Sequence, residues 1–527
     1  MFILLLLATT VVQDARGTQL IDRNRADRAL PVAPALPVAP TLPTPNVSAD
    51  RAAVPIAGIR FVGAHAPAKV AAAARPVLGQ RADKATLTRL ATALSAAYAG
   101  GDVALYTVAI PAQDFAGGVV TVSLTEGRVA RAQVVGTRAD AYPLLRRRLA
   151  PMAAETPLSR ATYERQSALI AAIPGLTTRT DFTDPTANGA LVMTVTPKQR
   201  RTKLTAGFSN RGVALLGDGQ LDARGEVYGA AIDGDQLAVS ASAAVDLKRY
   251  RYASIGYTAP IGASGLTASA NGAYLETRPR GYPLLGRAKQ AGATLGYPLV
   301  RRVHQAVDLS LGIDGLNSDN AAFGNIIASE RTRVARAAAG LVDVRTTRTV
   351  SLSASLSQGI AGLGTRIGTP FAKAGFGKLT AGASVNQAIG KRVVARVQAS
   401  GQYSPDVLPA AERFAIGGEA IGRAFDTALV TGDTGGGALA ELAFRPLKTT
   451  SFAQSEVYAF GDYGGTRVQA RPGLAREHYT LASAGAGVRA KYRTKAELGL
   501  EAARVLQSPY RGYGEDWRIS VAWRVSS

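Results

Sequence analysis

The chain has 527 residues, of which 61 are Lys or Arg and 38 are Asp or Glu, so its formal net charge is +23. It contains no cysteine and only three histidines, which excludes a disulfide scaffold and a cysteine-ligated zinc site and argues against a multi-histidine metal centre. The basic residues are scattered, and the two dense runs at 146–148 and 198–203 lack interleaved aromatic residues, so the charge does not indicate a nucleic-acid partner.

An apolar run at residues 2–12 lies at the start of the chain. It is too short to cross a bilayer as a helix, which needs about 20 residues, but it has the length of a signal-peptide core. A basic residue before the run and a clean cleavage site after it are both missing. We therefore expect a signal peptide over residues 1–15, and the alternative is the buried start of a strand or helix.

A polar helix and a proline-rich linker are expected next. Residues 16–30 are polar on nearly every side of a helix, and Arg23 and Asp27 have the spacing of an i,i+4 ion pair. Proline then recurs at every third position, which is the period of a polyproline II helix. Residues 31–52 are therefore expected to form a semi-rigid linker.

Two small α+β units with the same order of elements are expected after the linker. Alternating apolar residues indicate the strands, and Asp83 has the position of a helix N-cap. The first unit is expected to contain a strand at 59–61, a helix at 67–78, a helix that starts after Asp83, and strands at 106–111 and 119–125. The second unit is expected to contain a strand at 128–135, helices at 142–152 and 159–173, and strands at 177–182 and 190–196.

The first unit resembles a known domain. Its motifs are I-x-x-I-R-F-x-G at 56–63, Y-T-V-A-I-P-A-Q at 106–113 and T-E-G-R-V at 125–129. They are similar to the first POTRA domain of two-partner secretion transporters of the TpsB type, the outer-membrane pores that export filamentous haemagglutinins and haemolysins. The resemblance implies POTRA domains over 53–127 and 128–199, and it implies that residues 16–52 match the pore-plugging helix and linker of that family.

A client-binding edge is expected on these domains. An exposed strand edge can add an extended client strand, because such pairing needs main-chain hydrogen bonds more than a particular client sequence. We expect this edge in the first POTRA domain, and the candidate residues are Tyr106, Val108, Ile110 and Gln113. The alternative is that both domains act only as spacers.

A long series of strands is expected after residue 202. Segments of about ten residues alternate between apolar and polar side chains, as in W-R-I-S-V-A-W-R-V at 517–525. Ala, Gly and Ser dominate these segments, so the chain lacks the large hydrophobic residues that the second layer of a soluble sandwich needs. A closed transmembrane barrel needs no such layer, because lipid covers its outer face and water fills its interior.

The fold class predicted for residues 200–527 is therefore a membrane all-β barrel of about 16 antiparallel strands, preceded by the two α+β POTRA domains. A barrel of this size encloses an aqueous channel. Arg396 and Arg518 would cost about 2–4 kcal/mol each if they faced lipid at mid-membrane, so we expect them to point inward or lie near an interface. The strands are expected to start near residues 203, 220, 235, 250, 265, 287, 303, 331, 348, 373, 392, 435, 451, 478, 493 and 516.

One connection, at residues 403–434, is far longer than the usual few residues, which is typical of a functional loop. It contains R-F-A-I-G-G-E-A-I-G-R-A-F-D at 413–426. This motif resembles the F-x-I-G-G and V-R-G-Y/F signature of the loop that folds back into the lumen of POTRA-plus-barrel transporters. The resemblance implies a lumen loop whose motif residues are Gly417, Gly418, Arg423 and Phe425, with Gly422 and Ala424 where the family usually has Val and Gly.

Arg423 is expected to have a carboxylate partner, because one unpaired buried charge typically costs about 3–5 kcal/mol. The segment Y-A-F-G-D-Y-G at 458–464 is similar to a family motif whose aspartate faces the lumen and meets the loop arginine. The resemblance therefore implies Asp462 as the partner. Glu441, at the position of another acidic residue of the family, is the second choice.

The function expected from this resemblance is an outer-membrane pore that binds an unfolded exoprotein through periplasmic POTRA domains and translocates it without ATP. The exoprotein would be of the haemolysin, haemagglutinin or adhesin type and would carry an amino-terminal secretion domain. Other expected partners are outer-membrane lipid and, during biogenesis, the barrel-assembly machinery. The chain has no nucleotide-binding motif, neither G-x-x-x-x-G-K-[S/T] nor G-x-G-x-x-G.

Two alternatives to this function stay open, an insertase of the same superfamily that assembles outer-membrane proteins, and a passive porin. An enzyme is not expected, because no G-x-S-x-G nucleophile elbow is present and His65, His304 and His478 are isolated in the sequence. We therefore expect no catalytic residue, no metal site and no cofactor.

Overall fold

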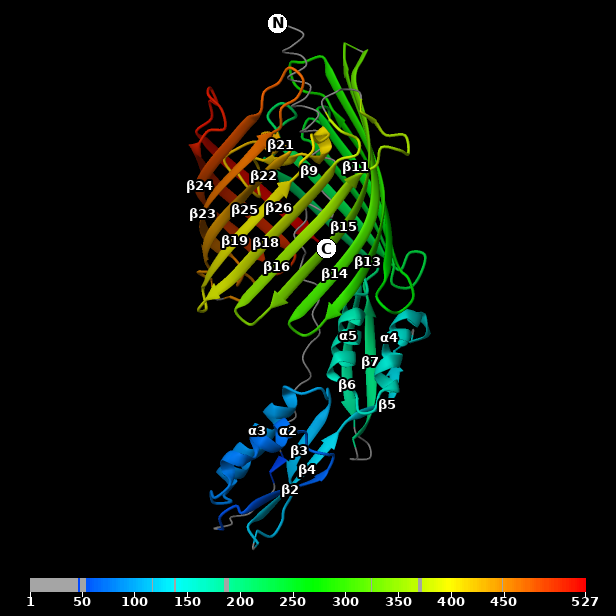
Figure 1. Cartoon of the computed structure of the whole chain (residues 1–527), viewed down its shortest axis with the longest axis vertical. Coiled ribbons are helices and arrows are strands. Elements are labelled where there is room, and N and C mark those ends of the chain that lie inside the picture. The colour runs from blue at the N-terminus through cyan, green and yellow to red at the C-terminus, as the bar shows by residue number, and fades with distance from the viewer. Residues whose placement is uncertain are drawn as a thin grey trace.

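The computed structural model describes residues 46–47, 54–115, 117–136, 139–183, 189–323, 325–367, 372–447 and 449–527. The expected signal peptide over 1–15 and polar helix over 16–30 lie outside the described residues, as does the linker over 31–52 except for 46–47. Two small α+β units lie one after the other at one end of a large β-barrel (Figure 1). No helix in the described part of the chain has the length and apolarity needed to span a bilayer.

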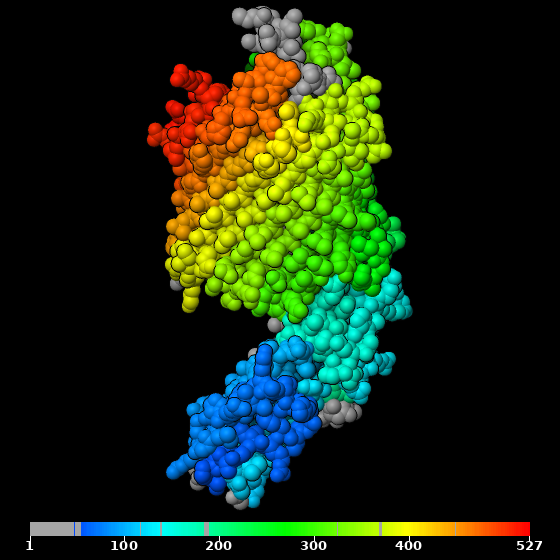
Figure 2. Space-filling model, in the orientation of Figure 1, coloured from blue at the N-terminus to red at the C-terminus, as the bar shows by residue number. Residues whose placement is uncertain are grey.

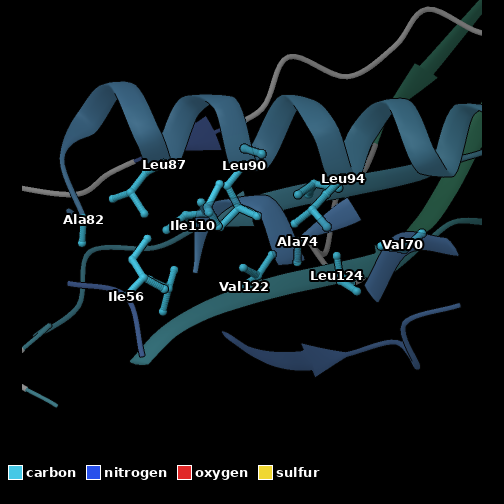
Figure 3. Packing of buried hydrophobic residues seen from close by; sticks show 14 of the residues in the cluster. Ile56, Val70, Ala74, Ala82, Leu87, Leu90, Leu94, Ile110, Val122 and Leu124 are labelled. Carbon is cyan, nitrogen blue, oxygen red and sulfur yellow. The ribbon is translucent and has the colours of Figure 1, made fainter. Parts of the chain in front are cut away.

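The first unit packs its helices against a four-stranded sheet of order β1-β3-β4-β2. Asp83 caps α3 by accepting a hydrogen bond from the backbone N–H of Thr86 at 2.7 Å. Leu87, Leu90 and Leu94 lie on one face of this helix and are fully buried against the sheet (Figure 3). The elements are β1 (Asn46–Val47), β2 (Gly58–Gly63), α2 (Ala68–Ala73), η1 (Arg75–Val77), α3 (Lys84–Ala99), β3 (Tyr106–Ile110) and β4 (Val119–Glu126).

The second unit repeats this order of elements. Its sheet has the order β5-β7-β6, so β6 forms one edge. Ser159 caps α5 by accepting a hydrogen bond from the backbone N–H of Thr162 at 3.2 Å, and Leu144, Leu149 and Met152 of α4 are buried in the core. The elements are β5 (Arg128–Val134), η2 (Ala139–Ala141), α4 (Pro143–Ala154), α5 (Arg160–Ala171), β6 (Leu176–Thr183) and β7 (Ala190–Gln199).

Hydrogen bonds join the two units directly. The backbone N–H of Ala104 donates to the carbonyl of Leu158 at 2.9 Å, and the N–H of Leu158 donates to the carbonyl of Gly127 at 3.2 Å. Arg160, the first residue of α5, donates from Nε to the carbonyl of Gly101, just after the end of α3, at 2.8 Å. These bonds hold the two units in a fixed orientation.

Sixteen full strands of the described residues close into an antiparallel barrel, which confirms the predicted fold class. Each strand pairs with its neighbours in sequence, and the last strand pairs with the first, with Trp523 opposite Phe208. The two-residue β17 (Arg366–Ile367) pairs with β15 in addition. The full strands are β8 (Thr202–Ser209), β9 (Gln220–Tyr228), β10 (Gln236–Ala244), β11 (Tyr250–Pro260), β12 (Thr267–Thr277), β13 (Leu284–Arg301), β14 (Gln305–Ala322), β15 (Asn325–Val344), β16 (Arg348–Gly359), β18 (Gly377–Ile389), β19 (Val393–Tyr403), β22 (Thr434–Phe444), β23 (Glu456–Val468), β24 (Glu477–Tyr492), β25 (Ala496–Gln507) and β26 (Trp517–Ser526).

The largest difference from the expected strand starts is at β15, which begins at Asn325 instead of near 331. The strand is 20 residues long, and its first part pairs with β14, which has 18 residues. Backbone pairing with β14 therefore carries the strand beyond its amphipathic segment, and alternation alone does not mark its start.

The two faces of the barrel wall differ in polarity. Leu311, Leu356 and Ile519 lie on the outer face and are 63%, 62% and 64% exposed. Arg396 and Arg518 point inward, as predicted, and pair with Glu441 and Asp426, each at 2.7 Å.

Figure 2 shows the second unit directly against the rim of the barrel and the first unit farther away.

Candidate functional site

The connection between β19 and β22 folds into the barrel. It contains η3 (Ala410–Glu412) and a hairpin of β20 (Phe414–Ile416) and β21 (Val430–Gly432). The hairpin contacts β22 and β23 of the barrel wall. Ile416 and Phe425 are 1% and 0% exposed. The long connection expected at 403–434 is therefore an internal element of the barrel, which we call the lumen loop.

The tip of the lumen loop requires glycine at two positions. Gly417 has a φ of 106°, and a Cβ atom there would lie 2.3 Å from the carbonyl oxygen of Asp426. Gly422 has a φ of 85°, and a Cβ atom there would lie 2.8 Å from the side chain of Leu481. Both φ values lie in the left-handed region that glycine enters without a steric penalty. The turn that presents Arg423 therefore depends on Gly422, where the resembling motif has Val.

Asp462 on β23 binds the backbone of this turn. Its two carboxylate oxygens accept hydrogen bonds from the N–H groups of Gly422 at 2.9 Å and Arg423 at 3.1 Å. The hydroxyl of Ser483 on β24 donates to the same carboxylate at 2.8 Å. Asp462 is thus fully hydrogen-bonded, although only 6% of its surface is exposed.

The guanidinium of Arg423 has different partners from the one expected. Its Nη1 atom lies 3.0 Å from Glu441 on β22 and 3.1 Å from Glu501 on β25. The guanidinium also lies over the ring of Phe460, 4.6 Å from its centroid. The expected side-chain pair with Asp462 is therefore corrected: Asp462 holds the main chain at Arg423, and Glu441, the second choice, meets the guanidinium.

These carboxylates belong to a larger charged network. Arg396 and Arg489 each bind both Glu441 and Glu456, at distances between 2.6 and 2.8 Å. Glu501 also pairs with Arg211 and accepts a hydrogen bond from the hydroxyl of Tyr458 at 2.8 Å. Arg445 also lies 3.6 Å from Glu456. The network thus joins five arginines to three buried glutamates: Arg211, Arg396, Arg423, Arg445, Arg489, Glu441, Glu456 and Glu501.

An apolar cluster surrounds this network. Phe425 packs against Tyr513, with ring centroids 5.3 Å apart, and lies in a cluster with Leu439 and Leu481 of the barrel wall. Burial of these apolar side chains stabilises the packed loop tip. It also keeps water away from the ion pairs, and electrostatic attraction is stronger where water is excluded. The loop tip is therefore fixed to β22–β25 by both kinds of interaction.

Two further carboxylates fix the base of the loop, and neither was expected from the sequence. Asp433 accepts hydrogen bonds from the N–H groups of Leu408 and Gln469 and from Arg471, each at 2.8 Å. Glu412 binds Arg336 of β15 and Lys378 of β18, both at 2.8 Å. Glu412 directly follows an apolar segment at 407–411, which is a signal in the sequence, whereas Asp433 lies in a polar, glycine-rich segment at 431–437 that carries no such signal.

The side chains of the four client-binding candidates contact other residues of the first unit. Tyr106, Val108 and Ile110 are 7%, 2% and 0% exposed, because their side chains form part of the core under α3. The side chain of Gln113 binds the backbone N–H and carbonyl of Thr121 at 2.6 and 2.8 Å. These side chains hold the first unit together, and the client-binding edge, which depends on main-chain hydrogen bonds, stays a prediction.

No group of three or more potential ligands, such as histidine or carboxylate side chains, is arranged to hold a metal ion in the part of the chain that the structure describes. The lumen loop is the site at which the candidate residues converge. Gly417, Gly418, Arg423 and Phe425 lie at its tip, and Glu441 and Asp462 lie on the two strands beneath it.

Solved structures show the same architecture. CdiB from Escherichia coli is similar with a TM-score of 0.69 and 18% sequence identity, over 98% of this chain and 96% of that chain. CdiB from Acinetobacter baumannii has a TM-score of 0.64 and 18% identity, over 98% of both chains. BamA from Haemophilus ducreyi lacking POTRA domains 1–3 has a TM-score of 0.54 and 13% identity, over 90% of this chain and 100% of that chain. No curated protein matches the sequence.

Two family models match the sequence itself. The model of the ShlB-type POTRA domain matches residues 54–127, which form the first α+β unit. The model described as haemolysin secretion/activation protein ShlB/FhaC/HecB matches residues 189–490, which is more than half of the chain. With its barrel, its lumen loop and this match, the chain belongs to the ShlB/FhaC/HecB family of outer-membrane transporters for two-partner secretion.

Proposed function

We propose that this transporter exports one unfolded exoprotein, of the haemolysin, haemagglutinin or adhesin type, from the periplasm to the cell surface. The two α+β units, which we name module 1 and module 2, lie on the periplasmic side and receive the client. The observation that carries the proposal is the combination of a sixteen-strand barrel, an internally anchored loop and two modules at one barrel end. A passive porin needs neither the modules nor the anchored loop.

Capture of the client is proposed at the edge strand β6 of module 2. Within the described residues β6 pairs with β7 along its whole length and with no other strand. An extended chain can add to such an edge through main-chain hydrogen bonds, largely independent of its sequence. Gly175, which directly precedes β6, packs against Tyr228 at the end of β9, so the edge leads to the mouth of the barrel.

Translocation is proposed to need no ATP, because the sequence has no nucleotide-binding motif. The client would leave as an extended chain and fold outside the cell. Folding outside makes return unfavourable, and this supplies the direction of transport.

The experiment that tests this function removes the chain from its host. We expect the exoprotein encoded beside it to disappear from the medium and to return when the full chain is supplied. Arg423→Ala should lower this recovery, whereas Arg504→Ala, which changes an exposed arginine next to Trp517, should not. Unchanged release from cells without the chain would refute the proposal. A general loss of outer-membrane proteins in those cells would favour the insertase instead.

A further inference from the structure

The inner faces of four adjacent strands, β10 to β13, carry one charged side chain, Arg301, which is the last residue of β13, lies beyond the bulge of that strand and is paired with Asp308 of β14. Val239, Ile255 and Leu295 mark their outer face, because they are about half exposed on the outside of the barrel. The other inward positions carry Ala, Gly, Ser, Thr, Asn, Gln, Leu, Tyr and Pro. A cavity of about 430 Å³ lies against this surface and is lined by residues such as Ala238, Ser240, Ser254, Asn271, Gln290 and Thr294. We call this surface the neutral wall.

The charges at the margins of the cavity are paired. Arg224 on β9 lies 3.0 Å from Glu226. Arg336 on β15 binds Asp314 at 2.5 Å and Glu412 of the lumen loop at 2.8 Å. These arginines are therefore already neutralised by carboxylates of the protein itself.

The opposite side of the barrel is different. The inner faces of β22 to β25 carry Glu441, Glu456, Asp462, Arg489 and Glu501, and all of these bind one another or the lumen loop. The loop tip covers these strands, with Ile421 against Gly437 and Phe425 in their apolar cluster. This half of the interior is therefore filled by the tip of the lumen loop. Ala411 of the same loop packs against Tyr250 and Leu275 at one end of the neutral wall, and the middle of the wall faces the cavity.

Module 2 is docked beneath the neutral wall. The carboxylate of Asp233, in the turn between β9 and β10, accepts a hydrogen bond from the N–H of Leu144 in α4 at 2.7 Å. Arg165 of α5 donates to the carbonyls of Ser264 and Pro298, each at 3.1 Å, in the turn before β12 and near the end of β13. Figure 1 shows α5 and β7 below the ends of β13 and β14. The module that we propose to receive the client thus lies at the foot of this wall.

We propose that the neutral wall of β10 to β13 is the track along which an extended polypeptide crosses the barrel. The proposal rests on the proposed function and adds the path and its selectivity. Fixed charges in a narrow, partly dehydrated pore would retain client residues of opposite sign and repel those of the same sign. Hydroxyl and amide side chains form weak, exchangeable hydrogen bonds with any main chain, so the neutral wall admits sequences of different charge.

The absence of cysteine from the sequence allows a direct test of the path in the full chain, reconstituted in planar bilayers. Single cysteines are introduced by Ser240→Cys and Asn271→Cys on the neutral wall and by Ser400→Cys on β19, opposite Gly437 on the loop side. The probe is the thiol reagent methanethiosulfonate-ethyltrimethylammonium. We expect it to lower the conductance about twofold at the two wall positions and to have little effect at Ser400→Cys. An equal or larger effect at Ser400→Cys would overturn the proposed path.

A second test uses export in the host. Ser240→Trp places a large side chain in the cavity beside the neutral wall and narrows it. Val239→Trp is the control, because it places the same side chain one residue away on the lipid-facing side, where aromatic residues are tolerated. We expect Ser240→Trp to lower the secreted exoprotein about tenfold relative to Val239→Trp, at equal amounts of folded barrel. Normal export by Ser240→Trp would refute the track but leave the proposed function intact. Export that does not depend on the chain at all would refute both.

Discussion

The two halves of the barrel wall use the same strand geometry for different purposes. On β22 to β25 the inward positions carry charged residues, and each of them is paired with the wall or with the lumen loop. On β10 to β13 the inward positions before Arg301 carry uncharged side chains, and those in the middle of the strands face a cavity. Buried charges require specific partners, whereas hydroxyls and amides beside water do not. One wall therefore fixes an internal loop, and the other borders a cavity that we propose is the path of the client.

The largest effect is expected from Glu441, the centre of the charged wall. Glu441→Ala removes the carboxylate that binds Arg396, Arg423 and Arg489 together and leaves them only Glu456 and Glu501, and loss of one partner in a buried ion pair typically costs about 3–5 kcal/mol. We expect the barrel to unfold at lower temperature and the lumen loop to become sensitive to protease. Glu497→Ala is the matched control, because the side chain of Glu497 is 40% exposed and, among the described residues, forms an ion pair only with Lys491, at 3.5 Å. Similar losses in both variants would show that the network does not anchor the loop.

The second prediction separates the two roles at the loop tip. Asp462→Ala removes the acceptor of two backbone N–H groups and should destabilise the loop by about 1–3 kcal/mol, measured as increased amide exchange at 417–429. The charge swap Arg423→Asp with Asp462→Arg should restore nothing, because the guanidinium of Arg423 binds Glu441 and Glu501. Recovery of export in the swapped chain would mean that a direct Arg423–Asp462 pair exists after all.

A smaller effect is expected at Gly422. Gly422→Val forces a branched side chain into the left-handed region and against Leu481, which should cost about 1–3 kcal/mol of stability. Gly461→Ala is the control, because a Cβ atom there meets nothing within 4 Å. The midpoint of thermal unfolding of the purified chain measures both. A fully stable Gly422→Val variant would show that the turn tolerates an ordinary residue.

A substitution on the neutral wall is expected to change stability least. It should instead change the ion preference of the pore. Asn271→Asp places a charge beside a hydrated cavity, so unfolding should shift by less than about 0.5 kcal/mol. The reversal potential in a KCl gradient should move toward cation preference, because a fixed negative charge attracts cations. Asn271→Gln should leave the potential unchanged. Failure of Asn271→Asp to alter the potential would place ion flow away from this wall.

The barrel could be predicted from the sequence because its two physical requirements are local. Alternation of side chains along each strand and turn residues between strands depend only on neighbouring positions, as in 517–525, and they identified the sixteen strands. The buried residues on β3 of module 1 were not assigned to its core from the sequence. The alternation of Tyr106, Val108 and Ile110 is typical of a strand with one face in the core. The resemblance to a POTRA domain suggested them as part of a client-binding edge.

The partner of Arg423 could not be predicted from the sequence with the same certainty, because it depends on how deeply the loop enters the barrel. Glu441, Glu456, Asp462 and Glu501 all occupy inward positions on neighbouring strands. Only the three-dimensional placement of the tip puts the main chain over Asp462 and the guanidinium between Glu441 and Glu501. Alternation therefore supplies the set of candidates, and packing selects among them.

The most direct test of export along the neutral wall is a disulfide trap in living cells. The exoprotein encoded beside this chain is given one cysteine and a fused domain that folds rapidly, so that it stalls in the barrel of a chain with Asn271→Cys or with Ser400→Cys. We expect a disulfide-linked adduct at Asn271→Cys and none at Ser400→Cys. An adduct confined to Ser400→Cys, or no adduct at either position while the exoprotein still leaves the cell, would contradict export along the neutral wall.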